Sequence, residues 1–248
     1  MRQTAHPPPP DNESIEELAR QSYRLRQGWF NQLKHSLWPP TPSHNLGGKL
    51  EEILESTPPQ SRILEVGNGG RRLRPSIVNL DIGPFAEVDA IGNGQNMPFA
   101  YNTFDAVICQ GVLEHVKEPR IIVDNILAVL QPGGLVYAEI PFLQGFHADP
   151  SDYQRYTIKG IEYLFRDYVK IDSGTCVGPS SALAWMLREY FALFFGRGKA
   201  HAYASHIFGW LTFWIKYGDL LLIRNPEAHR VASGLYFLGR KTSQQESG

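Results

Sequence analysis

A glycine-rich turn after a short apolar run is the first place where this sequence can do chemistry. Residues 63–70 read Ile-Leu-Glu-Val-Gly-Asn-Gly-Gly, so a buried strand is expected to run directly into glycines. Glycines let the backbone approach a ligand closely, and open parallel sheets bind their ligands at the carboxyl ends of the strands. Such a turn can serve a dinucleotide, a nucleoside or only a tight exit from the strand.

The residues that follow this turn separate those options. The run 71–75, Arg-Arg-Leu-Arg-Pro, leaves almost no length for the helix whose N-terminus would hold a pyrophosphate, and Pro75 would break it. A dinucleotide site is therefore disfavoured. Asp81 ends the next apolar run, 78–82, where its carboxylate can accept hydrogen bonds from both hydroxyls of a ribose. The alternative is a solvated acid at the end of a strand.

These residues need a parallel sheet to position them, and the chain has the pattern of one. From Arg62 onwards, short β-branched runs alternate with turns and helical patterns, which indicates an α/β fold with crossover helices. The expected strands are 63–66, 78–82, 88–91, 105–109 and 135–140, and the expected helices are 118–130 and 158–165.

The composition of the 248 residues excludes several other classes of protein. With 42% hydrophobic and 20% charged side chains, the chain can bury a sizeable core and is not predominantly disordered. The formal net charge of -1 argues against a nucleic-acid partner. Two cysteines, Cys109 and Cys176, are too few for a disulfide framework or a zinc site and suit a reducing compartment.

The N-terminal part, residues 1–60, is expected to be an arm followed by a helical extension. Residues 1–10 read MRQTAHPPPP and lack the apolar stretch of a secretory signal, so no export is implied. A cap at Asn12 and spaced apolar residues up to Leu33 predict an amphipathic helix, and a second short helix is expected at 46–55.

Five short motifs follow one another between Arg62 and about Phe165. They are Ile63-Leu-Glu-Val-Gly-Asn-Gly-Gly70, Asn79-Leu-Asp-Ile82, Asn96-Met-Pro-Phe99 with Phe104-Asp-Ala-Val107, Gly111-Val-Leu-Glu-His-Val116, and Val129-Leu-Gln-Pro-Gly-Gly134. In this order and spacing they resemble the motifs of class I S-adenosylmethionine-dependent methyltransferases, in the type 11 group that includes the quinone-biosynthesis methyltransferases. The resemblance implies S-adenosylmethionine as the cofactor. It also implies a Rossmann-like seven-stranded sheet with helices on both faces, within a domain of residues 61–248, with the last two strands at 168–174 and 234–240.

The resemblance further implies roles for individual residues of the cofactor site. The glycine turn at Glu65, Gly67 and Gly69 should face the methionine part of the cofactor, and Asp81 should take the ribose hydroxyls. Asn93 stands where family members often have an acid for the adenine amine, and its amide oxygen can accept the same hydrogen bond. The other cofactor-binding candidates are Asn68, Ile82, Met97, Gln110 and Gly111.

The methyl acceptor is expected beside the polar, aromatic loop 141–157, because this loop follows the carboxyl end of the fifth strand. Similar stretches in the group occur among saccharide and cell-envelope functions, which favours such substrates. His147 is the candidate general base, since its ordinary pKa of about 6.5 suits removal of a hydroxyl proton. Alternatively, His147 and Arg155 only tie the loop down through Asp149 or Asp152, or the reaction needs no base.

Arginines and aromatic residues supply the candidates for binding the acceptor. Arg71 stands where a third glycine often falls, and the arginines of 71–74 either form a solvated basic loop or hold an anionic group of the substrate. His115 is a second, less favoured catalytic candidate. His201 and His206 lack a third partner at ligand spacing, so no metal is predicted. The substrate-binding candidates are Arg71, Arg72, Phe146, Asp152, Tyr153 and Arg155.

About 55 residues, 177–231, separate the last two expected strands and are expected to form a helical insert. Eleven of the 29 aromatic residues and only six charged ones lie within 181–223. Three interpretations follow: a cap over the acceptor site, an interfacial membrane element through 205–223, or else ordinary helix packing or a dimer interface. The sequence leaves the oligomeric state open.

Together these features predict a cytoplasmic enzyme, peripheral to the membrane under one interpretation of the insert. It is expected to methylate a small-molecule, saccharide or lipid-linked acceptor, most simply on a hydroxyl oxygen. The alternative is a catalytically inactive scaffold or interaction protein that only binds S-adenosylmethionine, which the shortened first helix and Asn93 both allow.

Overall fold

The computed structural model describes residues 49–148 and 150–243. The expected N-terminal arm, the expected helix at 12–33 and Asp149 lie outside these residues. The end of the second expected N-terminal helix is described as α3 (Lys49–Ser56).

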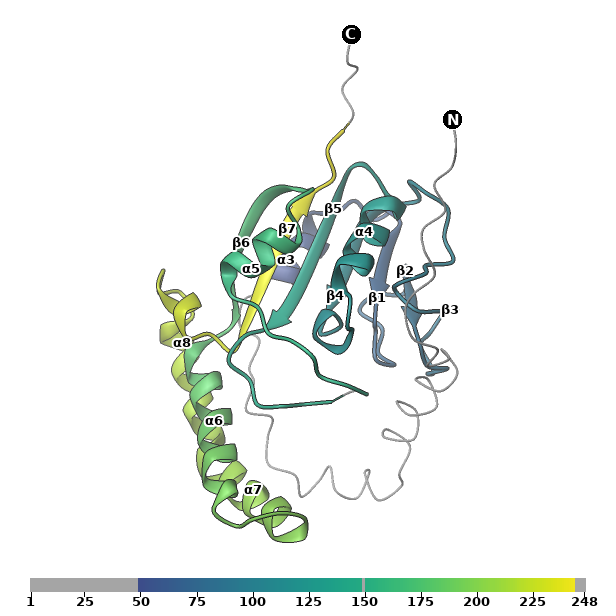
Figure 1. The fold of residues 1–248 in the computed structure, drawn as a ribbon. Coiled ribbons are helices and arrows are strands. Elements are labelled where there is room, and N and C mark those ends of the chain that lie inside the picture. The colour runs from purple at the N-terminus through teal and green to yellow at the C-terminus, as the bar shows by residue number, and fades with distance from the viewer. Residues whose placement is uncertain (1–48, 149, 244–248) are drawn as a thin grey trace.

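Seven strands form one sheet in the order β3-β2-β1-β4-β5-β7-β6 (Figure 1). The first five strands pair in parallel, whereas β7 runs antiparallel to both β5 and β6. The bounds are β1 (Ile63–Val66), β2 (Ile77–Asp81), β3 (Ala90–Ile91), β4 (Phe104–Gln110), β5 (Leu130–Pro141), β6 (Val169–Val177) and β7 (Gly234–Arg240). The predicted α/β sheet is confirmed, and β1 and β7 have the predicted bounds.

Helices cover both faces of this sheet because successive strand residues point to opposite sides. On one face, Leu64 of β1 and Val107 of β4 pack with α4 (Pro119–Val129) and α5 (Ile158–Leu164). On the other face, Ile63 and Ala106 pack with α3. The central parallel strands β1 and β4 are therefore buried on both sides, and the carboxyl ends of the parallel strands are the place where loops can form a site.

The connection from β1 to β2 contains turns in place of the usual crossover helix, as the sequence predicts. Arg72 holds this connection by donating hydrogen bonds to Glu87, Asp89 and the carbonyl of Ile77. Arg74 donates to the carbonyl of Leu54 in α3. These two arginines are therefore ties between parts of the fold, and the expectation of a solvated basic loop is wrong for them.

The segment between β6 and β7 is helical, as predicted, and begins with a helical hairpin that extends beyond the carboxyl ends of the strands (Figure 1). Its elements are α6 (Pro179–Leu193), α7 (Lys199–Thr212), the 3-10 helix η2 (Phe213–Gly218), α8 (Asp219–Leu222) and the 3-10 helix η3 (Ala228–Arg230). Within the part of the chain that the structure describes, no helix combines the length and apolar character needed to cross a membrane.

The hairpin of α6 and α7 buries small side chains and exposes large ones. Ala184, Ala192, Ala204 and Gly209 are buried between the helices. The exposed large apolar residues of 181–223 are Leu183, Met186, Tyr190, Phe191, Leu193, Phe194, Phe195, Tyr203, Ile207, Trp210, Leu211, Trp214, Tyr217, Leu220, Leu221 and Leu222. This arrangement is the reverse of an ordinary amphipathic surface helix, in which the large apolar side chains face the core.

Candidate active site at the carboxyl edge of the sheet

The glycine turn after β1 has a backbone that only glycine adopts easily. Gly67 and Gly69 have φ values of 75° and 61°. A Cβ atom on Gly67 would lie 2.2 Å from the Cγ2 atom of Val112, just beyond β4. The turn therefore fits closely against the segment after β4, and this brings the ends of two neighbouring strands together.

Glu65 is buried at the end of β1, with 1% of its surface exposed. Its Oε1 lies 3.6 Å from Nη2 of Arg71, and the same Nη2 donates to Oε1 of Gln110 at 2.8 Å. Burial raises the pKa of the Glu65 carboxyl, and Arg71 opposes this rise. The other oxygen, Oε2, has no hydrogen-bond partner among the described residues. Glu65 thus offers an acceptor that a ligand can use.

Asp81 ties the end of β2 to the glycine turn. Its Oδ2 accepts a hydrogen bond from the backbone N–H of Gly69 at 2.9 Å, and its Oδ1 accepts one from Gly83 at 3.1 Å. A carboxylate has about four lone-pair sites, so two of them stay available to other donors. Asp81 therefore shapes the turn and keeps capacity for the predicted ribose contact.

Asn68 and Asn93 use their side chains for local hydrogen bonds. The amide nitrogen of Asn68 donates to the carbonyls of Arg71 and Glu87, at 2.7 and 3.1 Å. The Oδ1 of Asn93 accepts from the backbone N–H of Gln95 at 2.9 Å. Both residues order the loops around the site, and the oxygen proposed to meet adenine already has one donor.

The other predicted cofactor residues lie along the same edge. Met97 is half-buried and packs against the core cluster beneath α4. Ile82 is half-buried directly after β2, and Gly111 follows β4 with a φ of 64°. The structure thus places the predicted cofactor residues on the strand-end loops of β1 to β4.

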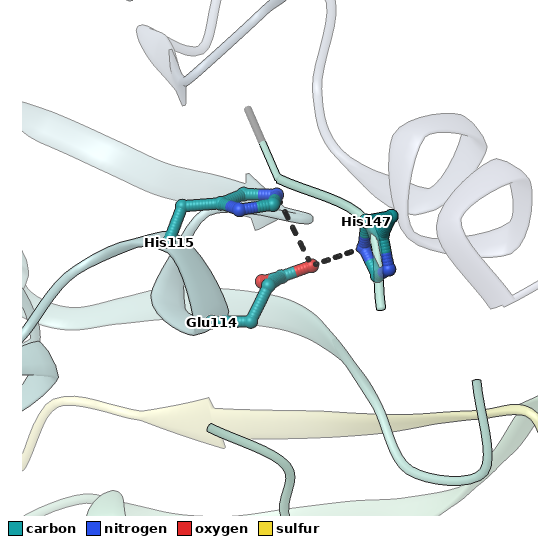
Figure 2. Close-up of side chains that lie close together, drawn as sticks. All are labelled: Glu114, His115 and His147. Carbon is teal, nitrogen blue, oxygen red and sulfur yellow. Dashed lines mark ion pairs between the residues drawn. The ribbon is translucent and has the colours of Figure 1, made fainter. Parts of the chain in front are cut away.

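A second group of side chains comes together beside this turn: Glu114, His115 and His147 (Figure 2). Glu114 and His115 belong to the 3-10 helix η1 (Leu113–His115) after β4, and His147 lies in the loop after β5. Oε1 of Glu114 is 3.7 Å from Nε2 of His147 and 3.8 Å from Nε2 of His115. Glu114 raises the pKa of the His147 imidazole, and burial opposes this rise.

Asp152 and Arg155 order the loop that carries His147. The Asp152 carboxylate accepts hydrogen bonds from the Arg155 guanidinium and from the backbone N–H of His147. Burial alone would raise the pKa of Asp152, but these bonds lower it to about 2. This arrangement agrees with the alternative in which Asp152 and Arg155 tie the loop down, because both Asp152 oxygens are already occupied by loop donors.

The loop is also tied to η1. The backbone N–H of Tyr153 donates to the carbonyl of Glu114 at 2.8 Å, and the side chain of Gln154 donates to the carbonyls of Leu113 and Val116. These bonds hold His147 next to Glu114.

The remaining substrate candidates differ in their availability. Phe146 and Tyr153 are exposed, as is Arg71, so each can reach a ligand. In Arg72 all five N–H groups already have acceptors, so the predicted contact between Arg72 and an anionic substrate finds no free donor.

Two residues of the site were missed by sequence reasoning. Glu114 stands beside the candidate His115, but its meeting with His147 depends on the adjacency of β4 and β5. Trp185 of α6 lies with its ring centroid 5.6 Å from that of His147, and a Cβ on Gly145 would be 2.5 Å from its Nε1. One sequence feature could have predicted that His115 and His147 lie near each other: both follow strands of the same parallel sheet.

Comparisons with known proteins show what this chain is similar to. Residues 80–138 match the family described as the methyltransferase domain. The fold is similar to 1,6-didemethyltoxoflavin-N1-methyltransferase of Burkholderia thailandensis, with a TM-score of 0.52, 14% identity and coverage of 95% of this chain and 94% of that one. These findings support the resemblance of the motifs to class I S-adenosylmethionine-dependent methyltransferases, and the structural similarity confirms the α/β fold.

The curated relatives that match this chain have a name that specifies the accepting atom. The ubiquinone biosynthesis O-methyltransferase of Xanthomonas axonopodis pv. citri is 24% identical over 182 residues, which are 60% of this chain and 70% of that protein. The protein of the same name from Xanthomonas campestris is 24% identical over 160 residues, and the match spans only 61% of its length. In Coxiella burnetii such a protein is 32% identical over 84 residues, 33% of each chain.

The residues at the strand ends fit the cofactor of this class. Oε2 of Glu65 has no hydrogen-bond partner among the described residues and can accept from an amine, and the turn at Gly67 packs too closely on Val112 to admit a Cβ atom. Asp81 retains acceptor capacity for hydroxyls. All three lie at the carboxyl ends of β1 and β2, where open α/β sheets bind nucleosides.

Proposed function

We propose that this protein transfers a methyl group from S-adenosylmethionine to a hydroxyl oxygen of a small-molecule, saccharide or lipid-linked acceptor. The observation that carries the proposal is the 3.7 Å approach of His147 Nε2 to Glu114 Oε1, beside a glycine turn suited to the cofactor. The name of the curated relatives, O-methyltransferase, supports oxygen as the accepting atom.

The cofactor is assigned to the residues at the ends of β1, β2 and β4. Glu65, the turn at Gly67 and Gly69, and Gln110 would hold its methionine part, and Asp81 its ribose. When bound, S-adenosylmethionine supplies an electrophilic methyl carbon, whose bond to sulfur breaks as an acceptor oxygen bonds to it, leaving S-adenosylhomocysteine.

The acceptor is assigned to the side where η1 and the loop after β5 meet. There, Nε2 of His147 would take the hydroxyl proton, and Glu114 would stabilise the resulting imidazolium. Phe146 and Tyr153 supply exposed aromatic surface, and Arg71 supplies a positive charge for an anionic group. In-line positioning supplies much of the rate in such a transfer, so these residues matter even where base catalysis contributes little.

Two measurements test this function and separate it from the inactive scaffold. Calorimetric titration with S-adenosylmethionine should give saturable binding, and incubation with methyl-labelled cofactor should move label into a lipid or polar fraction of a cell extract. Binding without any transfer would leave only the scaffold. Failure to bind at millimolar cofactor would overturn both.

His147→Ala tests the assignment of the base. It should keep cofactor binding and lower the transfer rate by roughly 100-fold, the smaller end of what general-base catalysis contributes. His201→Ala, on α7, is the matched histidine control and should keep the wild-type rate. Equal rates in wild type and His147→Ala would remove His147 from the chemistry.

The exposed apolar side of the insert supports a second proposal, contact with a membrane surface through 205–223. Trp210, Trp214 and Leu221 are among its exposed side chains, and this mixture of aromatic and aliphatic residues suits the interfacial region of a bilayer. The protein would then lie in the cytoplasm at the membrane periphery, close to lipid-linked acceptors.

Liposome co-sedimentation of the full chain tests this contact. Trp214→Ser with Leu221→Ser should reduce the bound fraction, whereas Tyr101→Ser, an exposed aromatic residue remote from the insert, should not. Unchanged binding in the double variant would discard the membrane contact. Dimerisation that is lost in the double variant would favour an interface between two copies.

A further inference from the structure

We propose that Glu114, His115 and His147 bind a divalent transition-metal ion. One ligand atom from each residue lies within 4.8 Å of the others (Figure 2). Ligand atoms at about 2.0–2.2 Å from a metal lie roughly 3–3.5 Å from one another, so the three need movements of about 1 Å or less to enclose an ion. Two histidines and one carboxylate are a common ligand set of open metal sites.

The Nε2 atoms of His115 and His147 both lie close to Oε1 of Glu114, at 3.8 and 3.7 Å. Their hydrogen-bond partners indicate that the lone pair of each imidazole is on Nε2. Nδ1 of His115 lies 2.5 Å from the carbonyl oxygen of Ser151, and Nδ1 of His147 lies 3.1 Å from that of Gly145. A carbonyl oxygen only accepts, so Nδ1 of His115 carries the proton and the lone pair of its neutral ring is on Nε2. Nδ1 of His147 also lies 3.3 Å from Nη2 of Arg155, which is a donor, but the carbonyl of Gly145 is nearer and favours the same tautomer. Both Nε2 atoms face Oε1 of Glu114. Histidine ligands of metals show the same pattern, with the second nitrogen donating to a backbone carbonyl.

The charge of Glu114 gives the second argument. Only 2% of its surface is exposed, and its Oε2 has no hydrogen-bond partner among the described residues. A buried carboxylate needs a compensating positive charge or hydrogen bonds. The Nε2 lone pairs of His115 and His147 both face Oε1 of Glu114, so one cation bound between them would be a partner for all three side chains. The competing arrangement places a proton on one imidazole, and the experiment below separates the two.

The site is held by the backbone around it. The backbone N–H of His147 donates to Asp152, and the backbone N–H of Tyr153 donates to the carbonyl of Glu114 in η1. Because the ligand residues come from two tied segments, little ordering is needed when an ion binds. The spacing of histidines along the chain does not predict this set, because Glu114 and His147 are brought together only by the fold.

The ligand types indicate which ions fit. Imidazole nitrogen suits Zn²⁺, Co²⁺, Fe²⁺ or Ni²⁺, whereas Mg²⁺ and Ca²⁺ prefer oxygen ligands. Three protein ligands leave coordination positions open for water or a hydroxyl group. If the proposed methyl transfer holds, the ion would replace His147 in activating the acceptor. It would bind the acceptor hydroxyl and lower its pKa, so that the proton passes to water, and Nε2 of His147 would be a ligand and not the base. Metal binding itself does not depend on that function.

The test measures metal binding to tag-free protein that has been treated with a chelator and dialysed. Zn²⁺ should bind with a stoichiometry of one in calorimetry, and Co²⁺ should produce visible absorption bands of a site with nitrogen ligands. Glu114→Gln and His147→Ala should each weaken Zn²⁺ binding by more than the roughly 10–100-fold that loss of an outer hydrogen-bond partner costs. His201→Ala should bind as the wild type does.

Each result decides the matter. Absence of stoichiometric Zn²⁺ and Co²⁺ binding would overturn the site and favour a protonated imidazole beside Glu114. Binding that survives in both Glu114→Gln and His147→Ala would place the ion elsewhere. Thermal unfolding in the presence of S-adenosylmethionine shows whether each variant still folds and binds the cofactor, so loss of the metal site is distinguishable from loss of the proposed function.

Discussion

The ring of Trp185 in α6 lies against the ring of His147, with 5.6 Å between the centroids and an interplanar angle of 45°. This contact joins the insert between β6 and β7 to the loop that carries the candidate base. The start of the insert therefore lies beside the proposed acceptor site, which supports the interpretation of the insert as a cap for this segment only.

Trp185→Ala should weaken acceptor binding and leave cofactor binding unchanged. Aromatic contacts of this kind contribute about 1 kcal/mol, so KM for the acceptor should rise roughly 5- to 10-fold. Steady-state kinetics with a soluble acceptor measure this. Phe194→Ala, at the exposed far end of the same helix, is the control and should keep KM. Equal KM values for wild type and Trp185→Ala would exclude Trp185 from the acceptor site.

Gly67→Ala should abolish cofactor binding, because its Cβ would collide with Val112 and the backbone would be strained at positive φ. Gly133→Ala is a matched control, since Gly133 has a φ of 82° but nothing within 4 Å of its Cβ position. Both variants should lose about 1–2 kcal/mol of stability from the left-handed backbone, and Gly67→Ala should lose more because of its collision with Val112. Only Gly67→Ala should lose calorimetric binding of S-adenosylmethionine, and equal loss in both would contradict this account of the turn.

Much of the fold follows from the sequence because the strands are contiguous apolar runs between turns. β1 and β7 could be delimited from local residues alone, and the missing helix after β1 follows from Pro75. β3 is shorter than expected, only Ala90–Ile91, because its pairing with β2 at the edge of the sheet is not a local property.

The residues of the candidate cofactor site could likewise be predicted from the sequence, because they belong to short motifs at the ends of strands. Those of the proposed acceptor site could not. Glu114 meets His147 only because β4 and β5 are neighbours and the loop after β5 folds back on η1. The sequence also does not predict which residues the charged side chains contact. The three arginines within 71–74 form hydrogen bonds with three different parts of the fold.

Asp219 is predicted to hold the insert in place. It is fully buried, and its carboxylate accepts hydrogen bonds from the N–H groups of Ser180 and Ser181 and from the Ser181 hydroxyl, at 2.7, 2.9 and 2.6 Å. Asp219→Ala should lower the free energy of unfolding by about 2 kcal/mol, as loss of a strong helix cap does. Denaturant unfolding measures this, with Glu227→Gln as an exposed control in the same insert. A change below about 0.5 kcal/mol would show that the cap contributes little.

Glu162 should make stability depend on pH in the acid range. Lys159, Lys170 and Ser173 lower its pKa from 4.5 to about 2, and they join α5 to β6. A lowered pKa stabilises the fold above the unfolded value of 4.5, and this contribution is lost as pH falls towards 2. Since both lysines are exposed, the contribution is about 1 kcal/mol or less.

Glu162→Gln measures this contribution. The variant should be less stable than the wild type at neutral pH, and the two free energies of unfolding should converge between pH 4.5 and about 2. Glu51→Gln, on the exposed side of α3, is the control for removing a surface charge. A difference that stays constant across that range would exclude titration of Glu162 as its cause.

The small residues buried between α6 and α7 have a thermodynamic consequence for the whole enzyme. A hairpin that keeps alanine and glycine inside gains little hydrophobic free energy from its own contact, so its rigidity depends on whatever covers its outer face. Trp185 belongs to the same helix and lies against His147. A membrane or partner that reduces the mobility of the hairpin would therefore also reduce the mobility of one side of the proposed acceptor site. If that membrane or partner raises the affinity for the acceptor, then by linkage the bound acceptor must raise the affinity of the hairpin for the membrane or partner by the same factor.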